Sequence, residues 1–355
     1  MLVRLRHRLA VLGLPVIAGC LVGVSATEAA VINVNLASPA VDVWNYPFAA
    51  NPGGNSNAAI FGSYSATGFH PDFDNRDGQM VIGFNTAAAG VAANLGQWRY
   101  TVLSARVSIT IESNGTFQYD PTPDSYRIWL PPNDPEFQVD TDPGHAVELF
   151  GTGFRNGVTA SSYAESTAYS PLGSFGKGIR SAYPLAVVNG NCVDISNNVD
   201  LRFQPTAFAV GLNSNLSPGQ VVPANTVLQF NINVNDADIH RYLRRALHAG
   251  KLNLTLASIF PAEQQQTGTY PRFYTKENIA VLAGLVGAAR LELSVNVSDT
   301  PVRAGDVNGD GAVNVNDLLA VINAWGACPC CAADVTYDNI VNVSDLLAVI
   351  NSWGS

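Results

Sequence analysis

The sequence Asp306-Val307-Asn308-Gly309-Asp310-Gly311-Ala312-Val313-Asn314-Val315-Asn316-Asp317 occurs near the end of the chain and carries oxygen-bearing side chains at its positions 1, 3, 5, 9 and 12. A second copy begins 28 residues later and has Asp334, Thr336, Asp338, Asn342 and Asp345 at the same positions. The segments 313–326 and 341–354 differ only at Asn316/Ser344 and Ala324/Ser352. The residues from 305 to 355, called the tail below, are therefore one loop and one helix written twice.

Alternate oxygen donors of this kind suit a loop that curls around a hard cation, and the spacing is that of an EF-hand calcium loop. Position 6 must turn sharply, which Gly311 and Asn339 tolerate, and position 7 offers a backbone carbonyl. We expect two calcium ions, with the second bound more weakly because Thr336 replaces the usual Asp or Asn. The expected ligands are Asp306, Asn308, Asp310, Ala312, Asn314 and Asp317 in the first loop, and Asp334, Thr336, Asp338, Ile340, Asn342 and Asp345 in the second. The alternative is a metal-free pair of helices.

The tail resembles a type I dockerin, through its two loops, Asp at position 12, and the repeated Asp-Leu-Leu-Ala-Val-Ile-Asn-x-Trp-Gly helices. Similar repeats end many secreted planctomycete proteins. The resemblance implies calcium-dependent folding and docking to a cohesin-like or cell-surface protein. The implied partner contacts are Val315, Asn316, Leu319, Val343, Ser344 and Leu347. We further expect the two helices to bury Leu318, Ile322, Leu346 and Ile350 against each other.

Composition excludes some classes of partner. The formal net charge is −9 and the chain has only three lysines, so nucleic acids and anionic membranes are poor candidates. Gly, Asn, Ser and Thr are abundant whereas charged residues are sparse, which is typical of a secreted β protein. The length allows one large β domain and a small tail.

Residues 1–30 have the pattern of an export signal: three arginines, an apolar run from Leu9 to Val24, and then small residues. We expect cleavage after Ala26 or Ala30 and no transmembrane segment in the mature chain. The alternative is a lipoprotein anchored through Cys20, because Ile17-Ala18-Gly19-Cys20 resembles a lipoprotein box.

Four cysteines remain after such cleavage, and three of them crowd together between the two calcium loops. An oxidising compartment favours disulfides, so we expect a bridge that ties this segment, with the pairing open. A zinc site is the alternative, although no histidine lies in the tail. The four residues are Cys192, Cys328, Cys330 and Cys331.

Residues 31–297 show hydrophobic alternation with a period of two, as at 107–111, 228–234, 252–256 and 291–297, which predicts half-buried strands. One helix is predicted over 239–247, capped by Asp236 or Asp238 and ended by Gly250. The fold class expected is mainly β, a jelly-roll-like two-sheet sandwich with one short helix, followed by a linker at 298–304 and an all-α EF-hand pair at 305–355.

A second resemblance concerns this sandwich. Asp74-Asn75-Arg76-Asp77, the segment 80–85 and Val102-Leu103-Ser104-Ala105-Arg106-Val107 are similar to the opening of the DNRLRE-type β-sandwich family, some of whose members bind carbohydrate. Residues 226–256 and 273–293 resemble the second half of that family. Asn85 departs from the usual Asp. For segment 72–78 itself, a solvated turn with Arg76 paired to a carboxylate competes with a further calcium cradle.

Sugar binding requires flat aromatic faces beside polar groups, and the expected platforms are Trp44, Tyr46, Trp98 and Trp129. For catalysis, Glu112, Glu136, Asp140, Glu148 and Glu165 form no recognisable pair, and no nucleophile or metalloprotease motif occurs. We therefore expect a secreted, non-catalytic protein in which the sandwich binds polysaccharide and the tail docks. The alternatives are a polysaccharide-degrading hydrolase or lyase and a structural envelope protein.

Overall fold

The computed structural model describes residues 31–49, 51–65, 68–171, 176–188, 191–264, 268–298, 305–308, 310–328, 330–338 and 340–354. The expected leader with Cys20 and both cleavage positions lies outside these residues, as does the expected linker apart from Ser298. None of the helices in the described part has the length and apolar character needed to cross a bilayer.

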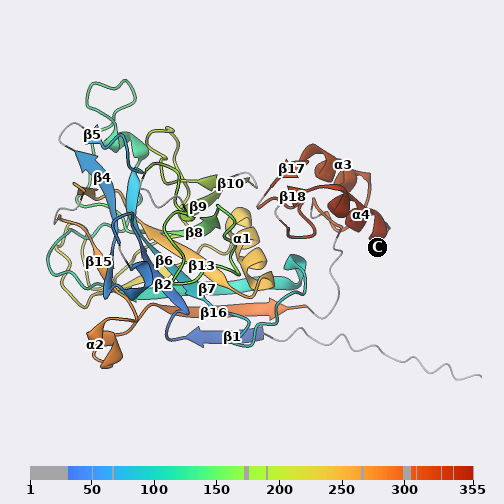
Figure 1. Ribbon diagram of the computed structural model, residues 1–355, viewed down its shortest axis with the longest axis horizontal. Helices are drawn as coiled ribbons and strands as arrows, with labels where there is room; N and C mark the ends of the chain where they lie inside the picture. Colours follow the sequence, from blue (N-terminus) through green and yellow to red (C-terminus); the bar gives the residue numbers. More distant parts are fainter. Residues whose placement is uncertain are drawn as a thin grey trace, which may run out of the picture.

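Two β-sheets form the framework of the sandwich (Figure 1), as the alternating pattern predicts. The smaller sheet has the strand order β1-β16-β7-β12, and all its neighbours are antiparallel. Its strands are β1 (Val31–Leu36), β7 (Tyr100–Thr110), β12 (Val227–Asn231) and β16 (Arg290–Val297).

The larger sheet follows the order β10-β9-β8-β13-β6-β4-β14, with β2, β5 and β11 added beside this path. Its strands are β2 (Val41–Asn45), β4 (Phe61–Ser65), β5 (Gly68–Phe69), β6 (Arg76–Phe84), β8 (Glu148–Phe154), β9 (Ala182–Val188), β10 (Asn191–Asp194), β11 (Ala209–Val210), β13 (Leu252–Ala257) and β14 (Pro261–Ala262). A separate small sheet pairs β3 (Asn57–Ala59) with β15 (Arg272–Tyr274).

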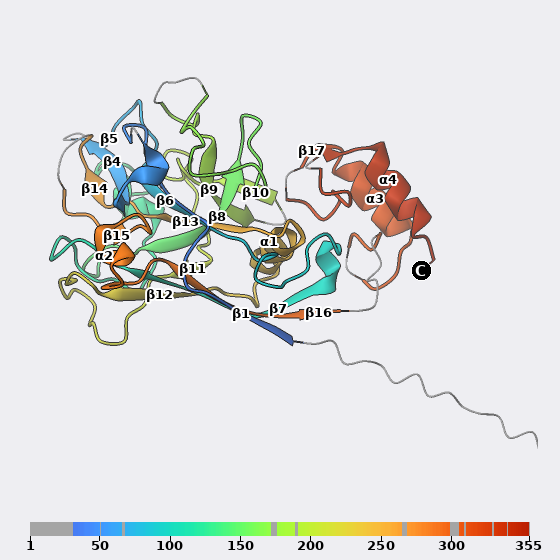
Figure 2. The same cartoon turned by 60° about the horizontal axis from the view of Figure 1, so that its bottom comes forward.

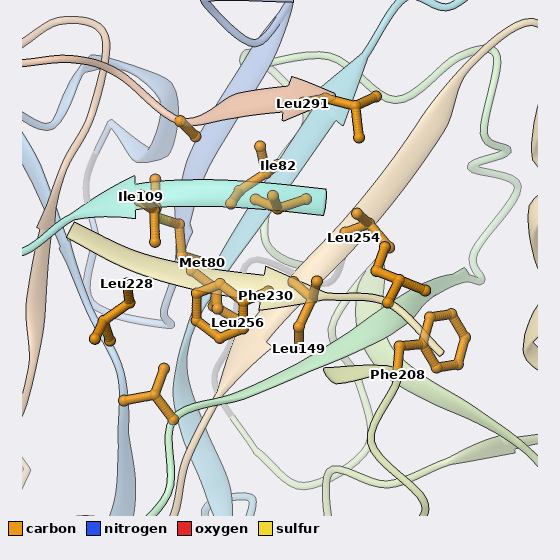
Figure 3. Packing of buried hydrophobic residues seen from close by; sticks show 14 of the residues in the cluster. Met80, Ile82, Ile109, Leu149, Phe208, Leu228, Phe230, Leu254, Leu256 and Leu291 are labelled. Atoms are coloured by element: carbon orange, nitrogen blue, oxygen red, sulfur yellow. The ribbon is translucent and has the colours of Figure 1, made fainter. Parts of the chain in front are cut away.

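One apolar core lies between the two sheets (Figure 3), and both contribute fully buried side chains to it. Ile109 of β7 and Phe230 of β12 come from the smaller sheet, whereas Met80 of β6 and Leu254 of β13 come from the larger one. The mainly β sandwich expected from the sequence is therefore confirmed, because alternate residues of each strand point into a shared interior.

The predicted helix is α1 (Ala237–His248), which buries Ile239, Leu243 and Leu247. Its N-cap is Asp236, whose carboxylate accepts hydrogen bonds from the N–H groups of Asp238 and Ile239. Gly250, at φ +74°, turns the chain away after the helix. A four-residue helix α2 (Ile279–Leu282) and the 3₁₀ turns η1 (Pro52–Gly54), η2 (Gln97–Arg99) and η3 (Tyr126–Trp129) complete the sandwich as described.

The tail contains the two expected helices, α3 (Val315–Asn323) and α4 (Val343–Asn351). Each begins with a capping box, formed by Asn314 with Asp317 and by Asn342 with Asp345. The strands β17 (Gly326–Ala327) and β18 (Ile340–Val341) pair with each other between the helices. Figures 1 and 2 both place the tail beside β10 and α1.

The segment Asp74–Asp77 is not the solvated turn considered from the sequence. Its side chains are buried where β6 begins, and Arg76 forms an ion pair with Glu148 at 2.7 Å. Arg180, itself fully buried, lies between Asp74 and Asp77 with nitrogen–oxygen distances of 2.7 and 3.1 Å. The pairing of Arg76 with a carboxylate was predicted correctly. The two aspartates already have a cationic partner, which leaves no need for a calcium ion here.

We predict that Arg180→Met destabilises the sandwich by about 3–5 kcal/mol, because two buried carboxylates lose the cation that compensates them. Urea unfolding followed by tryptophan fluorescence measures the change. Lys177→Met is the control, since its exposed pair with Asp200 contributes less than about 1 kcal/mol. Equal midpoints for the two variants would contradict this role of Arg180.

Candidate functional site

In the first loop of the tail, the carboxylates at positions 1 and 12 both turn inward. Asp306 accepts hydrogen bonds from the N–H groups of Asp310 and Gly311, at 3.1 and 2.9 Å. Asp317 is fully buried and accepts from the N–H groups of Val307 and Asn308. Gly311, at position 6, has φ +87°, the left-handed conformation that the sharp turn requires. The chain therefore brings the two ends of this loop together, as a cation-binding loop must.

A hydrogen bond from the Ala312 N–H, reinforced by the Asn308 side chain, lowers the pKa of Asp310 below its ordinary value. This carboxylate at position 5 is therefore ionised throughout the neutral range. An ionised oxygen at this position matches what a hard cation prefers.

The second loop repeats this arrangement around three aspartates. One carboxylate oxygen from each of Asp334, Asp338 and Asp345 lies within 4.8 Å of the others. Thr336 donates both its N–H and its hydroxyl to Asp345, at 2.9 and 3.0 Å. The expected turn residue Asn339 lies outside the described residues. Three converging carboxylates are a donor set that fits calcium, because their mutual repulsion is relieved by a divalent cation.

The second loop also contacts the sandwich, which the sequence does not indicate. The Arg245 guanidinium of α1 donates to the Asp334 carboxylate at 2.8 Å, and Asp334 is fully buried. Loop position 1 therefore faces a fixed positive charge from the sandwich. In the first loop, Asp306 accepts hydrogen bonds from the backbone N–H groups of Asp310 and Gly311.

Tyr337, at position 4 of the second loop, is the centre of this contact. Its hydroxyl accepts a hydrogen bond from the Gln97 N–H at 2.8 Å, and its ring lies 4.1 Å from that of His248, centroid to centroid. Its φ is +63°, an uncommon conformation for a bulky residue. Burial, together with the charge of Arg245, lowers the pKa of His248, so the stacked imidazole is neutral at pH 7.

A disulfide joins the two parts covalently. Cys192 of β10 pairs with Cys330 of the tail, and Cys328 pairs with Cys331. The expected bridge within the crowded segment is therefore present, and all four cysteines are consumed, which excludes the zinc alternative. The cross-link between sandwich and tail spans 138 residues of sequence.

A cleft of about 620 Å³ lies between sandwich and tail next to this contact. Aromatic rings line it together with amides and hydroxyls, the mixture that saccharides require. The lining includes Tyr183, Tyr242, His248, Lys251, Asn253 and Tyr337. Sequence reasoning missed them because they come from four separate segments, and only tertiary structure brings them together.

The expected partner-contact residues lie on the surface of the tail. Val315, Leu319, Val343 and Leu347 are between 49% and 56% exposed, and Asn316 and Ser344 are exposed beside them. The expectation for Ile322 and Ile350 is wrong, since they are 51% and 46% exposed. The helices pack through Val321 and Val349 instead, with Leu318 and Leu346 partly buried. Ile322 lies one residue, or about 100° around the helix, beyond the buried face.

The four expected sugar platforms differ in their surroundings. Tyr46 and Trp129 are only 4% and 8% exposed, so the expectation that they offer a face to a ligand is wrong. Both rings fill apolar clusters beneath the loops. Trp44 is half-buried and donates to the Ala59 carbonyl, and Trp98 is half-buried under the Arg244 guanidinium.

The carboxylates considered for catalysis mostly have structural partners. Glu112 forms an ion pair with Arg272, Glu148 with Arg76, and Glu165 with Lys276. The Tyr126 hydroxyl donates to Glu136 at 2.8 Å.

Comparison with known protein families shows that residues 304–354 match the dockerin type I domain. No curated protein matches the chain significantly. The resemblance drawn from the two loops is thus confirmed for the tail. Dockerin modules depend on calcium and engage cohesin-type partners. Such modules are typically extracellular or located at the cell surface.

We predict that Arg245→Gln increases the calcium affinity of the second loop about tenfold, or ~1.4 kcal/mol, because a positive charge no longer faces Asp334. Calorimetric titration of the calcium-free chain measures the affinity. Arg241→Gln is the control on the same helix, where the arginine pairs with Asp238. A lower affinity in Arg245→Gln would mean that the guanidinium supports the loop instead of opposing the ion.

Proposed function

We propose that this protein is secreted, lacks catalytic activity, and docks to a cohesin-like or cell-surface protein through its tail in a calcium-dependent manner. The observation that carries the proposal is the duplicated loop, in which carboxylates from positions 1 and 12 turn inward next to an exposed apolar helix face. An apolar surface of this kind gains binding free energy when a partner buries it. The loops make its shape dependent on calcium.

Two calcium ions are proposed, one per loop, with the second bound more weakly. Calcium supplies the positive charge that lets the converging carboxylates remain ionised while the helices are held in place. Thr336 weakens the second site because its hydroxyl is an uncharged calcium ligand, and it already donates a hydrogen bond to Asp345. The proposed ligands are Asp306, Asn308, Asp310, Ala312, Asn314 and Asp317, and Asp334, Thr336, Asp338, Ile340, Asn342 and Asp345.

The docking surface proposed consists of the exposed faces at the start of α3 and α4. Val315, Leu319, Val343 and Leu347 provide apolar area, and Asn316 and Ser344 provide hydrogen-bonding groups. The two faces have nearly the same sequence because the tail is an internal repeat.

A second function is proposed for the sandwich, the binding of extracellular polysaccharide. The cleft between sandwich and tail supports it, since Tyr183 and Tyr337 line a concave space together with Lys251 and Asn253. Trp44 and Trp98 are the remaining platforms of those expected from the sequence. The resemblance to the DNRLRE-type sandwiches agrees with this role.

We predict that Leu319→Asp/Leu347→Asp abolishes docking, with a loss of at least about 100-fold in affinity for cohesin-type domains, because charge is placed in an apolar contact. Surface plasmon resonance against a panel of such domains, with calcium and then with a chelator, measures the loss. Chelation is expected to remove both docking and the helical circular-dichroism signal of the tail.

The control for docking is Ile279→Asp/Leu285→Asp, which changes two apolar residues in and just after α2, outside the tail, that are even more exposed than Leu319 and Leu347. Binding that survives chelation or the tail substitutions would contradict the docking proposal.

We predict that the full chain is depleted from solution by an insoluble polysaccharide without releasing sugar ends, and that Tyr183→Ala weakens binding about tenfold through the loss of a stacking face. Depletion and reducing ends are measured in the same sample. Tyr274→Ala, on β15 away from the cleft, is the control. Released sugar ends would overturn the non-catalytic assignment, and equal binding by Tyr183→Ala and the wild type would move the site away from the cleft, with Trp44→Ala and Trp98→Ala tested next.

A further inference from the structure

The connection between β7 and β8, residues 111–147, brings together acidic residues from its two ends. One carboxylate oxygen from each of Asp120, Asp124 and Asp142 lies within 4.8 Å of the others. Asp124 also belongs to a second group of the same size, with Asp140 and His145. Four aspartates thus converge in a part of the molecule that is remote in sequence from the tail.

Asp120 is only 4% exposed, and its Oδ2 atom has no hydrogen-bond partner among the described residues. Its Oδ1 atom accepts hydrogen bonds from the N–H and the hydroxyl of Thr122. Burying a carboxylate without a cationic partner is costly, and the rest of the sandwich avoids it. The other buried carboxylates of the described sandwich each form an ion pair with a basic side chain: Asp42 with Lys276, Asp74 and Asp77 with Arg180, and Glu148 with Arg76. No such ion pair involves Asp120 in the part of the chain that the structure describes.

Thr122 shows the same shortage of positive charge. Its hydroxyl oxygen lies 2.6 Å from Asp120 Oδ1 and 2.8 Å from Asp142 Oδ2. A hydroxyl has one proton and can donate to only one acceptor at a time. The two carboxylates therefore compete for one hydroxyl proton, an arrangement that a cation would stabilise.

We propose that this loop binds a calcium ion through the carboxylates of Asp120, Asp124 and Asp142 and the hydroxyl of Thr122. The spacing Asp-x-Thr-x-Asp at 120–124 points alternate side chains to one side, as in the loops of the tail. Three carboxylates and a hydroxyl form an all-oxygen donor set, and calcium tolerates the irregular geometry of a loop. His145 positions Asp124, with its Nδ1 atom 3.0 Å from the Asp124 carboxylate.

Such an ion would close a long connection that has little regular structure. Between Ile111 and Val147 the only helical turn described is η3, and loops of this length are usually held by something other than their own backbone. Asp120 and Asp142 lie on either side of η3 in the sequence, so an ion between them fastens the segment that carries Trp129. The Trp129 ring lies 4.5 Å from that of His145, centroid to centroid.

The test counts bound calcium in the full chain. Wild type, Asp120→Asn/Asp142→Asn and Asp72→Asn/Asp200→Asn are stripped with a chelator, dialysed against calcium and analysed by mass spectrometry of the metal. The expected result is one ion fewer per chain for Asp120→Asn/Asp142→Asn only. Asp72→Asn/Asp200→Asn removes the same charge from exposed positions and should match the wild type. Because the comparison is with the wild type, ions in the tail cancel, and a tail that binds none leaves the difference unchanged.

A second measurement applies even if the variant binds calcium poorly for reasons of folding. Limited proteolysis with mapped cleavage sites should show cuts within 121–141 that calcium suppresses in the wild type and in the control. In chelator, Asp120→Asn/Asp142→Asn should be at least as stable as the wild type, since neutral amides relieve the repulsion. Equal calcium content in all three proteins, cleavage indifferent to calcium, or binding of zinc but not calcium would each overturn the proposal.

Discussion

Carboxylates that are removed from water must find positive partners, and much of this molecule's polar architecture follows from that need. Where β6 begins, the partner is a side chain, because Arg180 is held between Asp74 and Asp77. In the first tail loop the partners are backbone N–H groups, which converge on Asp306 and Asp317. The second tail loop uses both kinds, since Asp334 also pairs with Arg245 of the sandwich.

This last pair changes how the tail relates to the rest of the molecule. A docking module is usually imagined as a freely tethered unit, yet here it is fastened by a disulfide, an ion pair and the stacked ring of Tyr337. The ion pair and the stacked ring belong to the second loop, and the disulfide lies in the segment between the two loops. A force that a bound partner applies to the tail would therefore be transmitted directly to β10 and α1. The two halves of the tail have nearly identical helices, yet only the second loop is paired with the sandwich in the contacts described above.

In the proposed function, the same asymmetry lets the tail dock a partner while the cleft binds polysaccharide. The exposed apolar faces of α3 and α4 remain available while the second loop lies against the sandwich. The cleft beside Tyr337 forms only where the sandwich and the tail meet, because both contribute lining residues. In the proposed function, calcium holds the tail in shape, the tail completes the cleft, and the outer helix faces are left for a partner.

The sequence by itself determined the features that depend on neighbouring residues: the duplicated loops, the helix capped by Asp236, and the alternating strands on both sides of the core. These follow from local spacing, since each pattern repeats with the period of its own element. Only the tertiary structure decided which helix face is buried in the tail, that Tyr46 and Trp129 lie inside, that Arg180 meets Asp74, and that Cys192 pairs with Cys330. Such contacts join residues far apart in the chain, and they depend on how two sheets and a tail stack in space, which no local pattern encodes.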